Sequence, residues 1–398
     1  MKRSFQILLV VLALLGLLVM AGCGGGAAEP AAEEPAEEAA APAEAEEDME
    51  EPAAADEEPM IVGLSFSDFA TERWKTEEIQ MRGLLEDAGF EVITQEANHD
   101  PKLQNDQIDN MIAQGAKAII VIAEDGDAAA TAVDAAAEAG VGIISYDRLI
   151  KSANAAAYIS FDNVEVGRNQ ADGVMKALDI ENWDVEANGP ARIIMQGGNP
   201  TDNNAHLVRR GQYEIVQPYI DAGKVVIVGG DDIWVENWDP AKAMTQMENI
   251  LTAIDNGVDG VVASNDGTAL GALQAMSAQG LAGKVPISGQ DATADACNSI
   301  VKGEQTVTVF KDTRNLAPLA VDLAIKLAKG EDIPELVDFS MADLTGDDSW
   351  GDAVMPCLFL PVVQVTADNV YEEVVVSGFQ AYEDVYRDIP EEDRPPKP

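Results

Sequence analysis

The sequence predicts an α/β protein with two lobes, each built on a parallel β-sheet that is covered by helices on both faces. Short, almost continuously apolar segments alternate with longer segments of helical periodicity, which is typical of buried parallel strands and their connecting helices. The alternation occurs twice along the chain. A length of 398 residues, of which 47% are hydrophobic, is sufficient for two such domains.

The first half supplies four predicted strands and the three helices between them. The strands are residues 60–66, 90–96, 117–123 and 141–146, and the helices are residues 72–89, 100–115 and 127–140. We expect the chain to leave this first lobe near "YISFDN", residues 158–163. The pattern then repeats, with strands over residues 191–197, 224–230, 260–265 and 285–290, each followed by a helix.

The N-terminal residues resemble a bacterial lipoprotein signal. A basic start, "MKR", precedes the apolar run "ILLVVLALLGLLVM" and then "AGC", so Cys23 is the expected lipidated residue. The alternative is an uncleaved membrane helix, for which the apolar run is short. Residues 24–59 contain fourteen acidic and no basic residues, together with repeated Ala and Pro, and we expect them to form a disordered tether.

Composition excludes some partners. The formal net charge is −46, whereas nucleic-acid binding requires a basic surface. Three cysteines are too few for a disulfide framework. A disulfide between Cys297 and Cys357, both expected in the second lobe, stays open beside the alternative of two buried free thiols.

Polar side chains follow the predicted strands, at the edge where parallel sheets bind ligands. Asp68, Arg73 and Trp74 follow the first strand, and Asp147 and Arg148 follow the fourth. We expect this last pair at the rim of a cleft, exposed until a ligand encloses it. The corresponding positions of the second half are listed in chain order: Asp202, Asn203, Asn204, Trp234, Trp238, Asn265, Asp266, Asp291 and Lys311.

These residue types suit a sugar. Carboxylates, amides and guanidinium groups bind vicinal hydroxyls, and an indole covers the apolar face of a pyranose ring. Other interpretations exist for single residues. Asp202 and Asp291 each precede a helix and could be N-caps, and Arg148 and Lys311 could be ordinary ion-pair partners.

Several motifs resemble those of the D-xylose-binding proteins of sugar ABC transporters, which belong to the type I periplasmic binding protein superfamily. In chain order they are "ERW", "ISYDRLI", "YISFDNVEVG", "GGNPTDNNAHLVRRGQ", "VVASNDGT", "ISGQDA" and "TVFKDT". They extend from about Met60 to about Gly378 with comparable spacing. "FKDTRNLA" and "NWDPA" are also similar to motifs of multi-sugar-binding proteins that recognise glucose, galactose and arabinose.

The resemblance implies two Rossmann-like lobes, joined by three crossing hinge segments, that close around a sugar. Matching motif to motif implies these ligand-binding residues: Arg73, Trp74, Arg148, Asp202, Asn204, Trp234, Asn265, Asp291 and Lys311. The two tryptophans would stack on the faces of the ring, and the other residues would bind hydroxyls, with Lys311 near a hinge.

The domain boundaries predicted on this basis are a signal over residues 1–23, a tether over 24–59, a first lobe over 60–163 plus about 311–342, a second lobe over 164–310 plus about 343–380, and an acidic, proline-containing tail over 381–398. Residues 346–361 depart from the shorter pattern of the xylose-binding proteins.

The expected function is capture of a monosaccharide, with D-xylose as first choice, for delivery to an ABC permease. The alternative is a multi-sugar-binding protein that also serves a chemoreceptor. We expect an exported monomer that is anchored to the outer face of the cytoplasmic membrane by its lipid. An enzyme is not expected, because His99 and His206 have no nucleophile-and-base arrangement around them. No metal-ligand or cofactor motif is present, and the acidic tether stands where a sugar-responsive repressor would need a basic DNA-binding headpiece.

Overall fold

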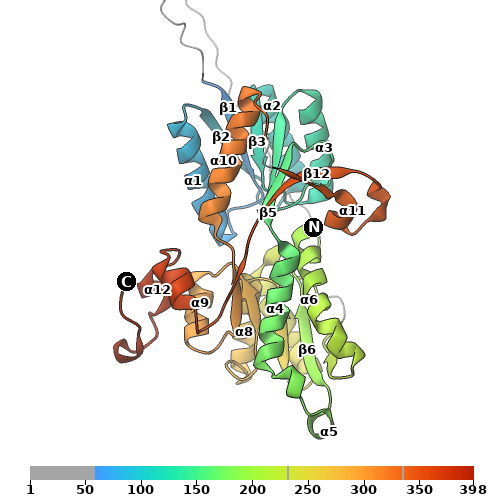
Figure 1. Cartoon of the computed structure of the whole chain (residues 1–398), viewed down its shortest axis with the longest axis vertical. Coiled ribbons are helices and arrows are strands. Elements are labelled where there is room, and N and C mark those ends of the chain that lie inside the picture. The colour runs from blue at the N-terminus through green and yellow to red at the C-terminus, as the bar shows by residue number, and fades with distance from the viewer. Residues whose placement is uncertain (1–58, 231–232, 334–335) are drawn as a thin grey trace, which may run out of the picture. The chain divides into compact units, whose positions relative to one another are not determined.

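The computed structural model describes residues 59–230, 233–333 and 336–398, which form two α/β lobes (Figure 1). The first lobe, at the top of the figure, is built on one seven-stranded sheet of order β11-β12-β5-β4-β3-β1-β2. Its strands are β1 (Ile61–Phe66), β2 (Glu91–Glu96), β3 (Ala116–Val121), β4 (Gly142–Tyr146), β5 (Ala157–Phe161), β11 (Val337–Ser340) and β12 (Val354–Leu360). All neighbouring strands of this sheet are parallel except β11 and β12.

Helices cover both faces of this sheet. The helices of the first lobe are α1 (Glu72–Asp87), α2 (Pro101–Ala113), α3 (Gly126–Glu138), α10 (Thr313–Lys329) and α11 (Met341–Thr345). One core lies between the sheet and the pair α1 and α10, where Met81 and Leu316 are fully buried. The second core lies under α2, α3 and α11. The predicted fold class is therefore confirmed for this lobe.

The second lobe is built on two three-stranded sheets of order β7-β6-β8 and β13-β10-β9, which an isolated bridge from Val261 to Ile287 connects. Its strands are β6 (Ala191–Gln196), β7 (Val225–Ile227), β8 (Gly260–Ala263), β9 (Ser288–Gln290), β10 (Val307–Phe310) and β13 (Val363–Val365). Its helices are α4 (Asn163–Ala177), α5 (Val185–Asn188), α6 (Asn203–Asp221), α7 (Pro240–Ala253), α8 (Asp266–Ala278), α9 (Ala294–Val301) and α12 (Tyr382–Val385).

The helices of the second lobe also cover both faces. Helices α4 and α6 enclose one core with Ile193 and Met195 of β6, and α7 and α8 enclose the other with Ile194. Several helices that follow a strand in the chain begin at an Asp or Asn whose side chain accepts backbone N–H groups of the first turn. These N-caps are Asp100 of α2, Asp125 of α3, Asp162 of α4, Asp202 of α6 and Asn265 of α8.

The described chain passes between the lobes three times, as expected. The first two passages lie between β5 and α4 and between β10 and α10, and the third joins β12 to β13. The predicted boundary near residue 342 is wrong, because residues 343–360 remain in the first lobe. Strand β12 pairs in parallel with β5, with Cys357 opposite Tyr158, and Met355 is buried in the first-lobe core.

The two cysteines consequently lie in different lobes. Cys297 belongs to α9 of the second lobe and Cys357 to β12 of the first, and both are buried free thiols. The expectation that both lie in the second lobe is wrong, and they form no disulfide. Residues 381–398, predicted as a tail, pack onto the second lobe, where Val385 and Tyr386 contact the cluster around Cys297.

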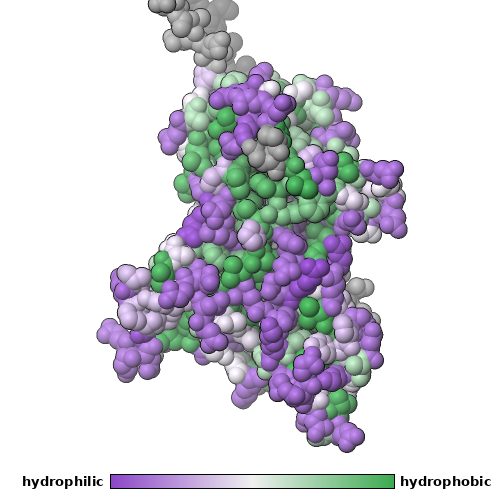
Figure 2. All heavy atoms as spheres, in the orientation of Figure 1, coloured by the Kyte–Doolittle hydropathy of each residue, from purple (hydrophilic) through white to green (hydrophobic). Residues whose placement is uncertain are grey.

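The edge of the first-lobe sheet exposes apolar side chains. Val337, Phe339 and Val354 of the β11–β12 pair are among the exposed large hydrophobic residues. Figure 2 shows hydrophobic colour over this lobe near β5 and β12, whereas the face of the second lobe is largely hydrophilic. Within the described ranges, no helix combines the length and the apolar composition that crossing a bilayer requires.

Candidate functional site: a polar cleft between the lobes

The lobes meet around a cleft of about 940 Å³ that side chains of both line. Arg73 and His99 contribute from the first lobe, and Trp238, Asn265 and Asp291 from the second. Asp291 directly follows β9, and Asn265 lies two residues after β8. The cleft therefore lies at the carboxyl ends of the strands, where the sequence predicts it.

The guanidinium group of Arg73 is held in place by the buried Glu77. Its Nε and Nη2 donate to the two carboxylate oxygens of Glu77, one turn further along α1, and the Tyr146 hydroxyl also donates to Glu77. Burial raises the pKa of Glu77 above its usual value in spite of the neighbouring Arg73. The remaining Nη1 lies 2.9 Å from Asp147 Oδ2 and 3.9 Å from Asp291 Oδ1, so it reaches a carboxylate of each lobe.

Asp147 lies at the end of β4 in a strained conformation that its neighbours hold in place. Its φ is 61°, and its carbonyl accepts from Tyr158, Ser160 and Asn204. Burial would raise the pKa of its carboxyl, but Arg73, Lys311 and Arg148 hold that pKa below its usual value. Asp147 is therefore a buried carboxylate with positive charge around it.

Arg148 crosses the cleft to the second lobe. Its Nε lies 3.1 Å from Asp202 Oδ2, and its Nη1 lies 3.7 Å from Glu124 and donates to the carbonyl of Ala123. Arg148 is 5% exposed in this structure, because a carboxylate of the opposite lobe covers it. The expectation that it is exposed at the rim in an open form stays a prediction.

Asp202 combines a capping role with a role in the cleft. One of its carboxylate oxygens accepts from the backbone of Asn204 at 2.9 Å, and the other accepts from the Trp238 indole at 3.1 Å as well as facing Arg148. Burial raises the pKa of Asp202 although Arg148 lowers it. The N-cap interpretation is thus correct for one oxygen, while the other faces the cleft.

Trp238, and not Trp234, is the indole that the second lobe presents to the cleft. It lies against Gly198, where an added Cβ would approach the ring to 2.0 Å. Trp234 packs elsewhere, with the Arg209 guanidinium 4.7 Å and the His206 ring 4.8 Å from its ring centroid. The structure therefore does not support Trp234 as a stacking residue. The two tryptophans follow the same strand four positions apart, so sequence could not rank them.

Trp74 lies beneath the two arginines. The Arg73 and Arg148 guanidinium carbons are 4.5 Å and 5.5 Å from its ring centroid, and the side chain is almost completely buried. Its role in this structure is to support both cations. Its Nε1 is a buried donor without a hydrogen-bond partner in the described part of the chain.

Lys311 and Asp291 complete the charged groups. Lys311 lies in the second passage between the lobes, with its Nζ 3.2 Å from Asp291 Oδ1 and 3.9 Å from Asp147 Oδ2. Asp291 has a φ of 99°, a conformation that L-residues rarely adopt. Both Asp147 Oδ2 and Asp291 Oδ1 are buried and have ion-pair contacts but no hydrogen bond of ordinary geometry among the described residues.

The two predicted asparagines have internal partners. Asn204 donates to Asp147, and its own oxygen accepts from Tyr158 and Asn163, so it links the lobes. Asn265 caps α8 reciprocally with Thr268 and also lines the cleft. Of the residues predicted to bind the ligand, Trp234 is the one that neither lines the cleft nor contacts the group of Arg73, Asp147, Arg148, Asp202, Asp291 and Lys311.

The structure also reveals partners that the sequence reasoning missed. Glu77, Tyr146, Glu124 and His99 support or extend the charged groups of the first lobe. The spacing of four between Arg73 and Glu77 on a predicted helix was an available signal for one of them. The other contacts join positions that are far apart in the chain.

One group of side chains has the composition of a metal site. Ligand atoms of Asp68, His99 and Glu124 all lie within 4.8 Å of one another. However, His99 Nδ1 lies 3.2 Å from Glu124 and Nε2 lies 3.9 Å from Asp68, so the two ring nitrogens face different carboxylates. Arg148 already supplies a positive charge beside Glu124. This is the geometry of a hydrogen-bonded imidazole.

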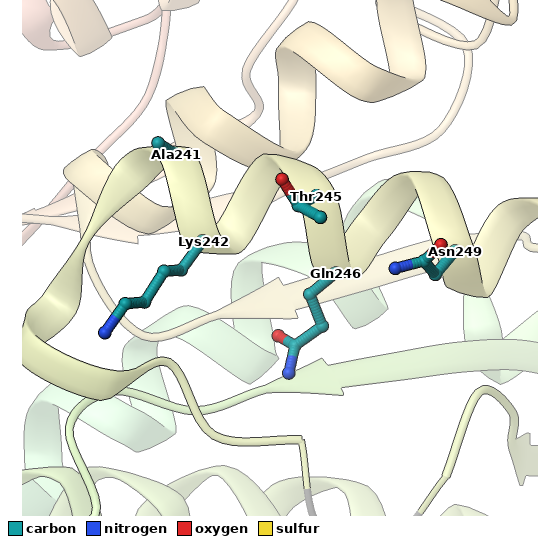
Figure 3. Close-up of a pocket in the computed structure, with 5 residues that line it drawn as sticks. All are labelled: Ala241, Lys242, Thr245, Gln246 and Asn249. Atoms are coloured by element: carbon teal, nitrogen blue, oxygen red, sulfur yellow. The ribbon is translucent and has the colours of Figure 1, made fainter. Parts of the chain in front are cut away.

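A second, shallow depression lies on α7 of the second lobe. Figure 3 shows Lys242, Thr245, Gln246 and Asn249 along the helix, with Ala241 at its start. These residues carry no convergent charged groups, and Lys242 pairs locally with Glu236. The depression therefore offers no chemistry comparable to that of the cleft.

Two α/β lobes, three passages between them and a polar cleft at the carboxyl ends of their strands define a ligand-capturing binding protein. The model of the family described as "periplasmic binding protein domain" matches residues 62–332. The chain therefore belongs to this family. It is accordingly a binding protein and not an enzyme.

Individual relatives agree with this assignment. The chain is 39% identical over 334 residues to the D-xylose-binding periplasmic protein of Haemophilus influenzae, covering 84% of this chain and 94% of the relative. It is 35% identical to the multiple sugar-binding periplasmic receptor of Rhizobium radiobacter, covering 80% of this chain and 89% of that protein. A solved ABC transporter solute-binding protein of Clostridium phytofermentans with bound β-D-glucose aligns with a TM-score of 0.72 and 29% identity, covering 82% of this chain and 99% of that structure.

Proposed function

We propose that this protein captures D-xylose in the cleft between its lobes and delivers it to the permease of an ABC transporter. The observation that carries the proposal is a set of three buried polar atoms at or beside the cleft that form no hydrogen bond within the described part of the chain, although the two carboxylate oxygens have ion-pair contacts: Trp74 Nε1, Asp147 Oδ2 and Asp291 Oδ1. Buried polar atoms are rarely left unpaired, and a sugar hydroxyl can both accept a hydrogen bond from the indole N–H and donate one to a carboxylate oxygen.

The charged side chains supply the rest of the recognition. Arg73, Arg148 and Lys311 are donors, and Asp147, Asp202 and Asp291 are acceptors. Each cation contacts a carboxylate, and several of these contacts join the two lobes. A sugar that enters exchanges these contacts for hydrogen bonds to its hydroxyls, while Trp238 supplies an apolar surface for its ring. Closure around the ligand then keeps the same groups paired.

The sugar preference rests on the relatives. A D-xylose-binding protein at 39% identity favours the pentose, whereas the multiple sugar-binding receptor and the glucose-bound structure support a broader specificity as the second candidate. A thermal-shift screen with D-xylose, D-glucose, D-galactose and L-arabinose tests the proposal, because a ligand that binds only the folded state raises its stability. We expect the largest shift with D-xylose. A larger shift with a hexose would favour the second candidate, and no shift with any of the four sugars would refute sugar capture.

The place of action is proposed on the same basis. The relatives' names support export, and the N-terminal sequence supports lipidation of Cys23, with residues 24–59 as a tether between membrane and folded lobes. Both segments lie outside the described residues. We propose a monomer that docks on its permease, with a chemoreceptor as a further candidate partner. Replacing Cys23→Ser should release the protein from the membrane fraction, and continued tight association with the membrane would contradict the lipid anchor.

A further inference from the structure

His99 lies on the first-lobe wall of the cleft, between β2 and α2, in the same cavity as Arg73 and Asp291. Its side chain is 23% exposed, whereas Asp68 and Glu124 on either side of it are buried. Its Nδ1 lies 3.2 Å from Glu124 Oε2 and its Nε2 lies 3.9 Å from Asp68 Oδ1, so the ring is held between two carboxylates at the cleft wall. A sugar hydroxyl, which can both donate and accept, can form a hydrogen bond with an imidazole nitrogen.

The backbone at His99 is in a conformation that glycine adopts freely and other residues do not. Its φ is 62°, and its N–H donates to the carbonyl of Ser67 at 3.0 Å. The preceding residue, Asn98, also has a positive φ of 48°, but its side chain is exposed. Strain of this kind persists where the surroundings hold it, and it gathers at ligand-binding sites.

Glu124 connects this imidazole to the predicted sugar-binding residues. Its Oε2 lies 3.2 Å from His99 Nδ1 and 3.7 Å from Arg148 Nη1. Burial raises the pKa of Glu124, although Arg148 and His99 both lower it. Glu124 thus contacts and orients the side chains of His99 and Arg148, as Glu77 orients the side chain of Arg73.

We propose that His99 is a further sugar-contacting residue that binds one hydroxyl of the captured sugar, and that Glu124 positions its ring. This inference rests on the proposed function. It explains why a strained position at the cleft wall carries an imidazole between two buried carboxylates. It also predicts that the side chain contributes to ligand affinity and discrimination and not to folding.

The backbone offers a test that separates these contributions. His99→Gly removes the ring and relieves the positive φ, so the unliganded protein should unfold at the same temperature as the parent or a higher one. D-Xylose affinity should fall about five- to tenfold, which corresponds to the loss of one hydrogen bond. Asn98→Gly is the matched control. It relieves a positive φ at the preceding residue and should leave the affinity for D-xylose unchanged. Both quantities are measured by calorimetry on the whole protein.

A series of monodeoxy-xyloses provides a readout that a structural role would not change. In the parent, removing the hydroxyl that His99 contacts should weaken binding, and in His99→Gly the same deoxy sugar and D-xylose should bind equally. Glu124→Gln should reduce the same discrimination. Unchanged D-xylose affinity in His99→Gly, or a lower unfolding temperature for that variant, would overturn the inference. If the parent bound no sugar at all, the proposed function would fail together with it.

Discussion

The guanidinium of Arg148 in the first lobe and the carboxylate of Asp202 in the second lie 3.1 Å apart, and both residues are at least 95% buried. This ion pair joins the two lobes. Asp202 has two further partners, the backbone of Asn204 and the indole of Trp238. A sugar that enters the cleft therefore competes with contacts that already exist, and the energy of binding is the difference between the two sets.

The first prediction concerns stability. Arg148→Ala should lower the free energy of unfolding by about 3–5 kcal/mol, because it leaves the carboxylate of Asp202 buried without its cation. Arg192→Ala is the matched control: its pair with Asp259 is half-exposed and should contribute less than about 1 kcal/mol. Urea unfolding of the unliganded proteins measures both. Equal, small losses in the two variants would show that the pair across the cleft is open in solution.

The second prediction separates the two tryptophans. Trp238→Ala should weaken D-xylose binding about tenfold or more, because its ring is the one that lines the cleft. Trp234→Ala should change affinity by less than about threefold, since this ring packs on Arg209 and His206. Fluorescence or calorimetric titration of both variants decides between them. A larger loss for Trp234→Ala would restore the assignment made from the sequence.

The third prediction is a pH dependence from Asp266, the first residue of α8. Burial and the neighbouring charge of Asp291 raise the pKa of its carboxyl to about 7, well above the ordinary value of an aspartate. A carboxyl with a raised folded-state pKa binds its proton more tightly when folded, so its contribution to stability is complete below about pH 4 and is lost as pH rises towards 7. Asp266→Asn should remove this loss, which is on the order of 4 kcal/mol.

The check on Asp266 is the difference in unfolding free energy between parent and variant at several pH values. Other carboxyls, such as Asp147 with its lowered pKa, act in the opposite direction in both proteins and cancel in this difference. The parent should lose stability relative to Asp266→Asn between pH 4 and pH 7. A constant difference over that range would show that Asp266 is not protonated at its buried site.

The fourth prediction concerns the thiols. Because Cys297 and Cys357 lie in different lobes as buried free thiols, a reducing agent should leave the unfolding temperature unchanged. Mass spectrometry of the unreduced, denatured protein should find both thiols open to alkylation. An intramolecular link between them would require a different placement of β12.

Local patterns were sufficient to predict most of the fold. The apolar runs at residues 60–66 and 191–197 became β1 and β6, and the first passage between the lobes lies at Asp162, within the predicted region. The placement of β12 could not be read in the same way. Its partner is β5, with Cys357 opposite Tyr158, and nothing in residues 346–361 themselves indicates which sheet they join.

The site was predicted less completely, for a physical reason. Position after a strand identified Arg73, Arg148 and Asp291, because chain topology brings those ends together. The choice between Trp234 and Trp238 depends on a turn in which Asn237 and Trp238 both have positive φ. The contacts of Glu124 with His99 and Arg148 depend on three-dimensional packing, which no local spacing encodes.

The most direct test of the account is a calorimetric titration of D-xylose into the parent, Arg148→Ala and the control Arg192→Ala. We expect saturable binding by the parent, the same affinity for the control, and an affinity about ten- to a hundredfold lower for Arg148→Ala, because hydrogen bonds from a charged group contribute roughly 1.5–3 kcal/mol. Tighter binding of D-glucose than of D-xylose by the parent would leave the assignment of the cleft as the sugar site intact, but would replace D-xylose as the preferred ligand. Unchanged D-xylose affinity in Arg148→Ala would contradict the assignment of the cleft as the sugar site.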